Sequence, residues 1–219
     1  NIDTGIYYFP SNFVYWKKIP KHESVKNKIL EFINNNPKIL ETYEAVTNGK
    51  STFNNKGMYD FFSRNDDVCN SIIWETLEEV VHELNSKESS EKVNISSSFI
   101  NGVWCSKYDA NSIVSCHNHE GDGNIVSHVD GTPFKLSFAI LYIVNDTNVS
   151  NKTEFIQTSS QRVSAYGTSE TRFNTSKVKD IGEGTVLVFP TNLYHHVNQM
   201  LEPGRVIISA NISSHFTPT

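Results

Sequence analysis

The feature that most constrains the fold is a change of pattern near residue 90. After it, short runs rich in β-branched and aromatic residues alternate with polar turns, which predicts strands. These runs are Val93–Ile100, Val103–Tyr108, Ser112–His117, Asn124–Val129, Leu136–Val144, Thr153–Gln157, Thr185–Phe189 and Val206–Ile212. About eight strands in this length predict a jelly roll or double-stranded β-helix, the cupin-like barrel.

Before residue 90, helical signals dominate. Val25, Ile29 and Ile33 recur at helical spacing, and Asn36-Pro37 ends that helix and predicts another through Ile39, Leu40 and Tyr43. Asn65-Asp66-Asp67 is a suitable cap for a longer helix. The apolar stripe of this helix is expected to pack on a sheet, and it consists of Val68, Ile72, Ile73, Leu77, Val80, Val81 and Leu84.

The two patterns together predict one structural domain of mainly β structure with N-terminal helices. Residues 1–90 are expected to form a helical extension that packs on a β core at residues 91–219. Thr158 to Asp180 is long, polar and poorly patterned, so it is predicted to be a loop or broken hairpin that serves as a lid.

Composition excludes some classes of partner. The net charge of −5 gives no general attraction to nucleic acid or to anionic membranes, and no apolar run is long enough to span a bilayer. Three cysteines without Cys-x-x-Cys spacing argue against a structural zinc site and a disulfide framework, which favours a cytoplasmic protein with reduced thiols. The six Asn-x-Ser/Thr sequons are interpreted as chance products of an Asn-, Ser- and Thr-rich chain. The sequence does not predict the oligomeric state.

Metal-ligand chemistry is suggested by His128-Val129-Asp130 followed by a later histidine. Two histidines and one carboxylate are the ligand set of a mononuclear non-haem iron(II) site. Residues two apart on a strand point to the same face, so His128 and Asp130 can act together. Neighbours on a strand face opposite sides, so only one of His195 and His196 can join them.

A second histidine pair leaves an alternative open. His117 and His119 are also two residues apart and can share one strand face. They can form a polar loop cluster, contact a co-substrate or substrate, or bind a metal.

Several segments, in order, resemble the iron(II)- and 2-oxoglutarate-dependent oxygenases, in particular the prolyl-4-hydroxylase-like branch. The resemblance covers roughly residues 95–216, and no single motif in it would be specific alone. The matching segments are His128-Val-Asp, Leu136-Ser-Phe-Ala-Ile-Leu-Tyr-Ile-Val-Asn, Thr153-Glu-Phe, Gly184-Thr-Val-Leu-Val-Phe-Pro-Thr-Asn-Leu-Tyr-His-His-Val and Gly204-Arg-Val-Ile-Ile-Ser-Ala-Asn.

The resemblance implies Fe(II), 2-oxoglutarate and O2, with ascorbate as a supporting reductant. It makes His128, Asp130 and His195 the metal ligands, because the family's His-x-Val register fits His195 with Val197. It makes Arg205 the partner of the distal carboxylate of 2-oxoglutarate, a role that suits a planar guanidinium. Weaker candidates around the co-substrate are Thr153, Tyr142 and His119, and candidates for substrate contact are His196 and Trp104.

Two departures from the family pattern stand out. A Tyr-x-x-Gly segment that usually precedes the His-x-Asp is missing from the stretch before His128, and His119 is one residue that could replace its tyrosine. The nucleic-acid demethylating branch has a second arginine where this chain has Asn211, which speaks against a nucleic-acid substrate.

The implied activity is hydroxylation of a protein or peptide residue, with proline as a candidate, and release of succinate and CO2. A small-molecule substrate is also compatible with the sequence. The alternatives are a metallohydrolase that uses the same His, Asp and His residues, in which Arg205 has no role, and a non-catalytic cupin-like binding protein.

Overall fold

This computed structural model describes residues 4–9, 12–86, 94–120, 126–147, 153–164 and 167–217. Within these ranges, no helix is both long enough and apolar enough to cross a membrane.

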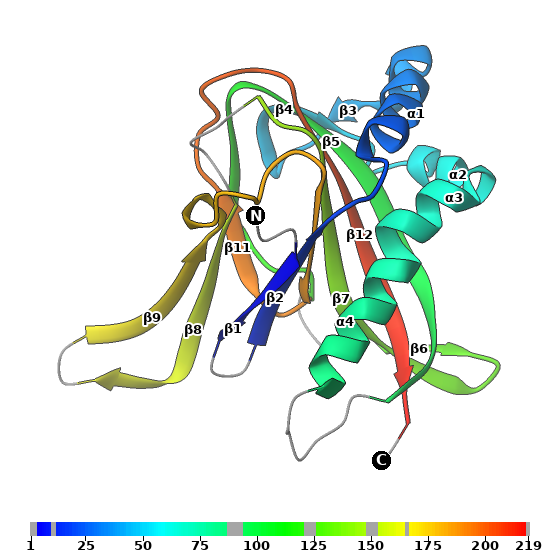
Figure 1. Cartoon of the computed structure of the whole chain (residues 1–219). Helices are drawn as coiled ribbons and strands as arrows, with labels where there is room; N and C mark the ends of the chain where they lie inside the picture. The colour runs from blue at the N-terminus through cyan, green and yellow to red at the C-terminus, as the bar shows by residue number, and fades with distance from the viewer. Residues whose placement is uncertain are drawn as a thin grey trace.

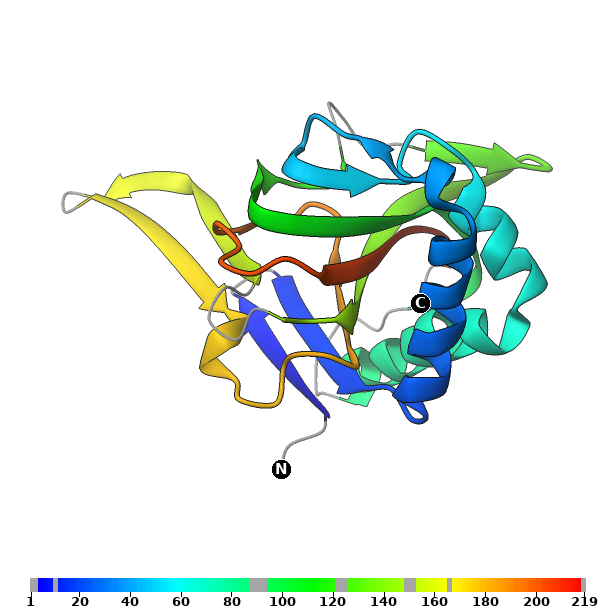
Figure 2. The same cartoon turned by 90° about the horizontal axis from the view of Figure 1, so that it is seen from above.

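A single antiparallel sheet forms most of the molecule (Figure 1). Its strands run in the order β1-β2-β10-β7-β12-β5-β11-β8-β9, while β3 and β4 pair beside β5, and β6 pairs with β7. The strands are β1 (Thr4–Phe9), β2 (Asn12–Lys18), β3 (Glu41–Thr42), β4 (Val46–Ser51), β5 (Ile95–His117), β6 (Val126–Val129), β7 (Thr132–Asn145), β8 (Thr153–Ser164), β9 (Gly167–Asn174), β10 (Thr185–Pro190), β11 (Tyr194–Val197) and β12 (Arg205–Phe216). Viewed from above, the sheet curls, and the helices gather on one side of it (Figure 2).

The helices agree with the sequence in part. α1 (His22–Asn35) is confirmed, and the helix predicted after Asn65 consists of α3 (Asp66–Cys69), a π-helical turn (Asn70–Trp74) and α4 (Glu75–Ser86). The helix predicted through Tyr43 is wrong, because a single 3-10 turn (Pro37–Ile39) leads there into β3. α2 (Gly57–Arg64) was not predicted, although it buries Met58, Phe61 and Phe62.

Strand alternation divides the core into two clusters, one on each face of the sheet. In β7, Ile140 and Tyr142 pack in the cluster that includes the helices, while Leu141 and Ile143 pack in the cluster on the opposite, concave face. The same alternation along β12 puts Ile208 on the helix side and Ile207 on the concave side. Arg205 is two residues before Ile207 and therefore belongs to the concave face.

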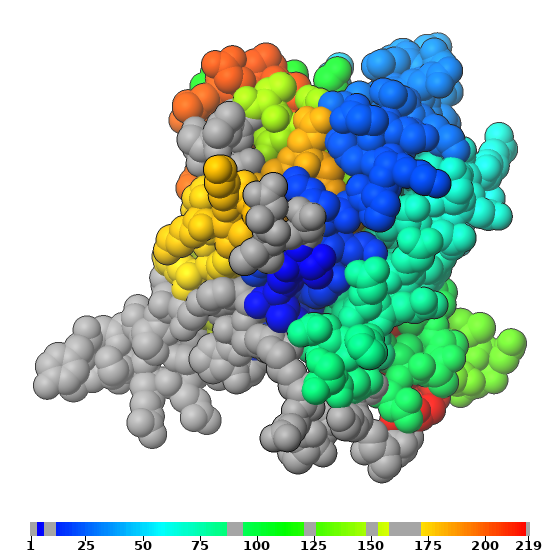
Figure 3. All heavy atoms as spheres, in the orientation of Figure 1, coloured from blue at the N-terminus to red at the C-terminus, as the bar shows by residue number. Residues whose placement is uncertain are grey.

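The region before residue 90 contributes strands as well as helices. β2 lies between β1 and β10 in the sheet, and five of its seven side chains are buried. In the space-filling view, the blue N-terminal strands and the adjacent helix α4 lie across the front of the molecule (Figure 3). A division at residue 90 therefore does not separate the helices from the sheet.

The segment predicted as a loop or broken hairpin at 158–180 is largely a hairpin. β8 and β9 pair from Glu154 with Asn174 out to Ser164 with Gly167, with one irregularity, and a 3-10 turn (Thr175–Lys177) follows. The hairpin projects from one end of the sheet (Figures 1 and 2).

Candidate functional site

A cavity of about 310 Å³ opens on the concave face of the sheet. It is lined by residues of β4, β5, β7, β11 and β12, and by Thr153 at the start of β8. Its described lining contains aromatic, aliphatic, amide, hydroxyl and imidazole side chains, and among these residues there is no Asp, Glu, Lys or Arg. Among the described residues, a charged side chain near this site therefore lies behind the cavity wall.

Three histidines meet in this cavity. His117 ends β5, His119 follows it, and His195 on β11 pairs across the strands with His117. The ring centroids of His117 and His195 are 4.4 Å apart, those of His119 and His195 5.0 Å, and those of His117 and His119 5.4 Å. One nitrogen from each ring lies within 4.8 Å of the others, which is a spacing from which small rotations can close around a metal ion.

Hydrogen bonds at Nδ1 determine which nitrogen of each ring is available to bind a metal. Nδ1 of His117 contacts the carbonyl oxygen of Ser115 at 2.8 Å, and Nδ1 of His119 contacts Oδ1 of Asn211 at 2.6 Å. Nδ1 of His195 contacts the carbonyl oxygen of Leu193 at 3.3 Å. An oxygen acceptor at Nδ1 requires the proton there, so Nε2 of each ring carries the free lone pair. This arrangement of outer partners is typical of metal-binding histidines.

Burial keeps two of these imidazoles neutral. It lowers the pKa of His119 to about 4, against a smaller opposing effect from the hydrogen bond to Asn211. Burial, together with the neighbouring His119 and His117, holds the pKa of His195 well below its usual range. A metal ion binds the neutral form of imidazole, so no proton has to be displaced from these two rings near neutral pH.

The predicted ligands His128 and Asp130 lie elsewhere. Both are exposed on the β6–β7 hairpin, and β6 pairs with β7 alone among the described strands. This hairpin and the β8–β9 hairpin, whose first strand pairs with β11, lie at opposite ends of the molecule (Figures 1 and 2). Among the described residues, His128 and Asp130 belong to no group of three candidate ligands, so the structure does not bring them to His195.

Asp130 has a local role instead, in the turn of that hairpin. His128 pairs with Pro133 and Val129 with Thr132, which leaves Asp130 and Gly131 as a two-residue loop. Their φ angles of 50° and 79° fit the Asp-Gly pair of a type I′ turn, in which both residues are left-handed.

We therefore expect Asp130→Val to lower the free energy of unfolding by about 1–2 kcal/mol, because a β-branched residue is strained in a left-handed conformation. Asp130→Asn and Asp130→Gly, which tolerate that conformation, are the matched controls and should unfold close to wild type in urea. Loss of metal binding in Asp130→Asn would contradict the assignment of Asp130 to the turn alone.

Arg205 and Thr153, predicted around the co-substrate, do lie together. The Arg205 side chain is fully buried, and its Nη2 is 3.5 Å from Oγ1 of Thr153, which lines the cavity. Nε of Arg205 lies 3.9 Å from Oδ1 of Asp146, also buried. Burial lowers the pKa of Arg205, while Asp146 and Tyr108 oppose that shift.

The other three predicted contacts differ from one another. Tyr142 is on the helix side of the sheet, where its hydroxyl bonds Nδ1 of His22 at 2.7 Å, so it does not reach the cavity. His196 contacts Oε2 of Glu154 at 2.9 Å and does not line the cavity. Trp104 lines the cavity, with its ring centroid 5.7 Å from that of His119.

Tyr108 also lines the cavity and pairs across the strands with Arg205, and sequence reasoning did not connect it with the family's Tyr-x-x-Gly segment. A signal was present, since Tyr108-Asp-Ala-Asn111 precedes His117 much as the Tyr-x-x-Gly segment precedes the family's first ligand. Asn111 has a φ of 66°, a conformation that glycine or asparagine can supply. In that resemblance, His117 corresponds to the first histidine of the family motif and His119 to its aspartate.

The donor set fits a divalent transition metal. Three imidazoles suit iron, nickel, copper or zinc, and a site with three protein ligands leaves positions open for other groups. His117, His119 and His195 are the residues that would hold it, while the carboxylate that the sequence predicted is absent from the cluster.

Comparison with known proteins bears on the fold. No protein-family model matches the chain, and no curated protein sequence matches it. Among solved structures, SnoK, a non-haem alpha-ketoglutarate-dependent carbocyclase from nogalamycin biosynthesis, has a TM-score of 0.54 at 6% identity over 90% of this chain and 79% of its own. HygX from Streptomyces hygroscopicus, with nickel, 2-oxoglutarate and hygromycin B bound, has a TM-score of 0.51 at 10% identity over 91% and 82%. A prolyl-4-hydroxylase from Pseudomonas putida reaches 0.47 at 9% identity over 92% and 91%.

The likenesses to SnoK and HygX identify the fold. The chain has the double-stranded β-helix found in 2-oxoglutarate- and iron-dependent oxygenases, which confirms the fold class predicted from the sequence.

Proposed function

We propose that the chain is a non-haem metal-dependent oxygenase that uses 2-oxoglutarate and O2 and holds its metal with His117, His119 and His195. The observation that carries the proposal is the composition of one cavity. Three histidines with free Nε2 lone pairs line it, and Arg205 lies directly behind Thr153 in its wall. A metal and a guanidinium are the two groups that a 2-oxo dicarboxylate needs at its two ends.

The chain's own residues bind and orient. In this proposal Arg205 receives the distal carboxylate of 2-oxoglutarate, with the hydroxyl group of Thr153 beside it and Tyr108 on the neighbouring strand. The metal, when bound, supplies the chemistry that activates O2 for attack on a C–H bond. The apolar concave face excludes bulk water, which protects that chemistry from side reactions.

An aromatic wall supports an uncharged, ring-shaped reacting group. The rings of Tyr43 and Phe53 stack at 4.7 Å, and Phe53 meets Trp104 edge-to-face at 5.1 Å, next to His119. A cavity of about 150 Å³ holds a benzene molecule, so this one has room for a small co-substrate and one further ring. A proline in an extended peptide has these properties and binds aromatic-lined grooves. We therefore propose hydroxylation of a protein or peptide residue, with proline as the first candidate, and release of succinate and CO2.

A zinc hydrolase is the second candidate, because three histidines and an open position also form a catalytic zinc site. Such an enzyme usually needs a general base near the metal-bound water. The described cavity lining offers no carboxylate for this role, and Arg205 would have no part in the reaction.

Two measurements test the proposal. With Fe(II) and 2-oxoglutarate under anaerobic conditions, we expect a visible charge-transfer band, and on admission of O2 we expect release of succinate. Ascorbate is expected to sustain turnover. Folded, iron-loaded protein that gives neither band nor succinate would contradict the proposal, and zinc-dependent hydrolysis would favour the second candidate. Mass spectrometry of proline-containing peptides, scored for the gain of one oxygen atom, tests the substrate.

A further inference from the structure

A buried ion pair lies behind the cavity wall. Nε of Arg205 and Oδ1 of Asp146 are 3.9 Å apart, and their side chains are 0% and 2% exposed. Arg205 reaches the cavity wall through its contact with Thr153. A buried carboxylate thus stands beside the guanidinium that is proposed to bind an anion.

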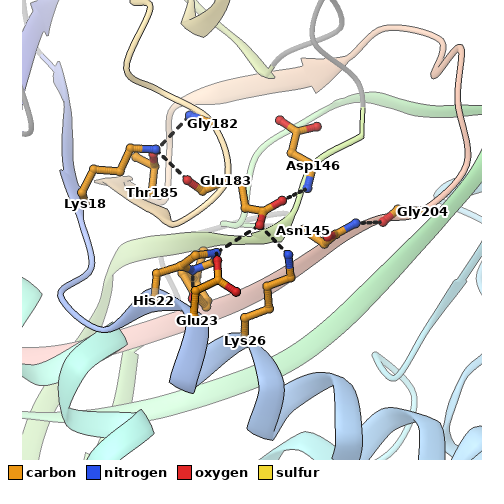
Figure 4. Close-up of polar contacts among 11 residues, drawn as sticks. Lys18, His22, Glu23, Lys26, Asn145, Asp146, Gly182, Glu183, Thr185 and Gly204 are labelled. Carbon is orange, nitrogen blue, oxygen red and sulfur yellow. Dashed lines mark hydrogen bonds and ion pairs between the residues drawn. The ribbon is translucent and has the colours of Figure 1, made fainter. Parts of the chain in front are cut away.

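Asp146 is held in place by its surroundings (Figure 4). Its backbone N–H donates to Oε2 of Glu183 at 3.1 Å, and Glu183 is paired with Lys26 of α1. The preceding residue, Asn145, donates from Nδ2 to the carbonyl oxygen of Gly204 at 2.7 Å. Since Gly204 immediately precedes Arg205, these bonds fix the end of β7 against the start of β12. The carboxylate and the guanidinium therefore face each other before any ligand binds.

The count of charges explains why a carboxylate is useful there. The usual ligand set contributes one negative charge to a divalent metal, whereas three neutral imidazoles contribute none. A divalent metal and Arg205 then carry three positive charges against the two negative charges of 2-oxoglutarate. With Asp146 included, the charges of these four groups (the metal, Arg205, Asp146 and 2-oxoglutarate) cancel, and an uncompensated charge in a buried site is unfavourable.

We propose that Asp146 supplies the negative charge that the three-histidine set lacks. It thereby weakens the binding of dicarboxylates by Arg205 enough for succinate to leave after each turnover. The inference rests on the proposed function. Co-substrate and product are both dianions, and succinate must leave before the next 2-oxoglutarate enters. Asp146 acts through Arg205 and the total charge, so it is a positioning residue rather than a catalytic one.

Two substitutions, one that removes the carboxylate at position 146 and one that introduces a carboxylate at position 119, test this inference. Asp146→Asn keeps the shape of the side chain and removes its charge, so nickel-loaded protein should bind 2-oxoglutarate at least about fivefold more tightly by calorimetry. His119→Asp adds the missing carboxylate to the metal set and should weaken binding by about the same factor. The double variant restores the total charge and should lie within about threefold of wild type. A purely structural role for Asp146 would instead weaken binding in both variants that carry Asp146→Asn.

The matched control is Glu154→Gln, which removes a carboxylate that contacts His196 outside the cavity and should leave the dissociation constant within about twofold of wild type. If Asp146→Asn alone does not fold, the double variant decides the question. Weaker binding in the double variant than in His119→Asp, or in folded Asp146→Asn than in wild type, would overturn the inference and leave the proposed function intact. Wild-type protein that binds nickel but no 2-oxoglutarate would overturn both.

Discussion

Replacing His195 with alanine is expected to abolish the stabilisation that a divalent metal gives this protein. Metal at a hundredfold excess over its dissociation constant adds about 2.7 kcal/mol to the stability of the folded state. In a domain of this size that corresponds to a rise in Tm of roughly 5–10 °C. His117→Ala and His119→Ala should lose most of the same rise, because each removes one of the three ligand nitrogens.

The controls for this experiment are the ligands expected from the sequence. His128→Ala and Asp130→Asn should keep the full nickel-induced rise in Tm, because both residues are exposed on the β6–β7 hairpin. His196→Ala should also keep it, since His196 contacts Glu154 instead of the cluster. The comparison uses the shift on adding nickel, because loss of the buried His195 side chain also lowers the Tm of the metal-free protein. A normal shift in His119→Ala, with none in Asp130→Asn, would refute the assignment.

Local sequence pattern located the strands β5, β6, β7, β8, β10 and β12, but not the limits of each. It divided residues 93–117 into three strands, but the structure has the single strand β5, which pairs with β12 along most of its length. The residues between those predicted strands, among them Gly102 and Asn111, instead lie within β5, near or at irregularities in its pairing. β2 escaped notice because both of its faces are buried, so its sequence has no alternation to detect.

The metal ligands show the limit of the same reasoning more sharply. The inference that His128 and Asp130 share a strand face depended on local geometry, and so did the equal inference for His117 and His119. Which pair meets His195 depends on which of the strands β5 and β6 pairs with β11. The structure shows that β5 does. Strand pairing between distant segments is a property of the whole sheet and leaves little trace in either motif.

Arg205 was selected because Gly204-Arg205 resembles the family strand that holds the co-substrate, and its role there stays a prediction. In the structure this guanidinium is buried at the start of β12, and a buried guanidinium is unfavourable unless it has a partner. The structure provides Asp146 as one partner and directs a further part of the guanidinium toward Thr153 and the cavity. The arginine therefore contributes both to folding and to the proposed binding of the co-substrate, and the two contributions can be separated by substitution.

Arg205→Met is expected to lower the free energy of unfolding by about 3–5 kcal/mol, because it removes the buried cation that faces the carboxylate of Asp146. Arg205→Lys keeps the charge near Asp146 and should lose much less stability, but it cannot make two parallel hydrogen bonds to a carboxylate. We expect Arg205→Lys to bind 2-oxoglutarate about 10- to 100-fold more weakly, which corresponds to the loss of one charge-assisted hydrogen bond. Urea unfolding measures the first effect, and calorimetry on nickel-loaded protein measures the second. Both variants should keep the nickel-induced rise in Tm, since Arg205 is not a metal ligand. Binding of 2-oxoglutarate by Arg205→Lys at wild-type affinity would show that its distal carboxylate is anchored elsewhere.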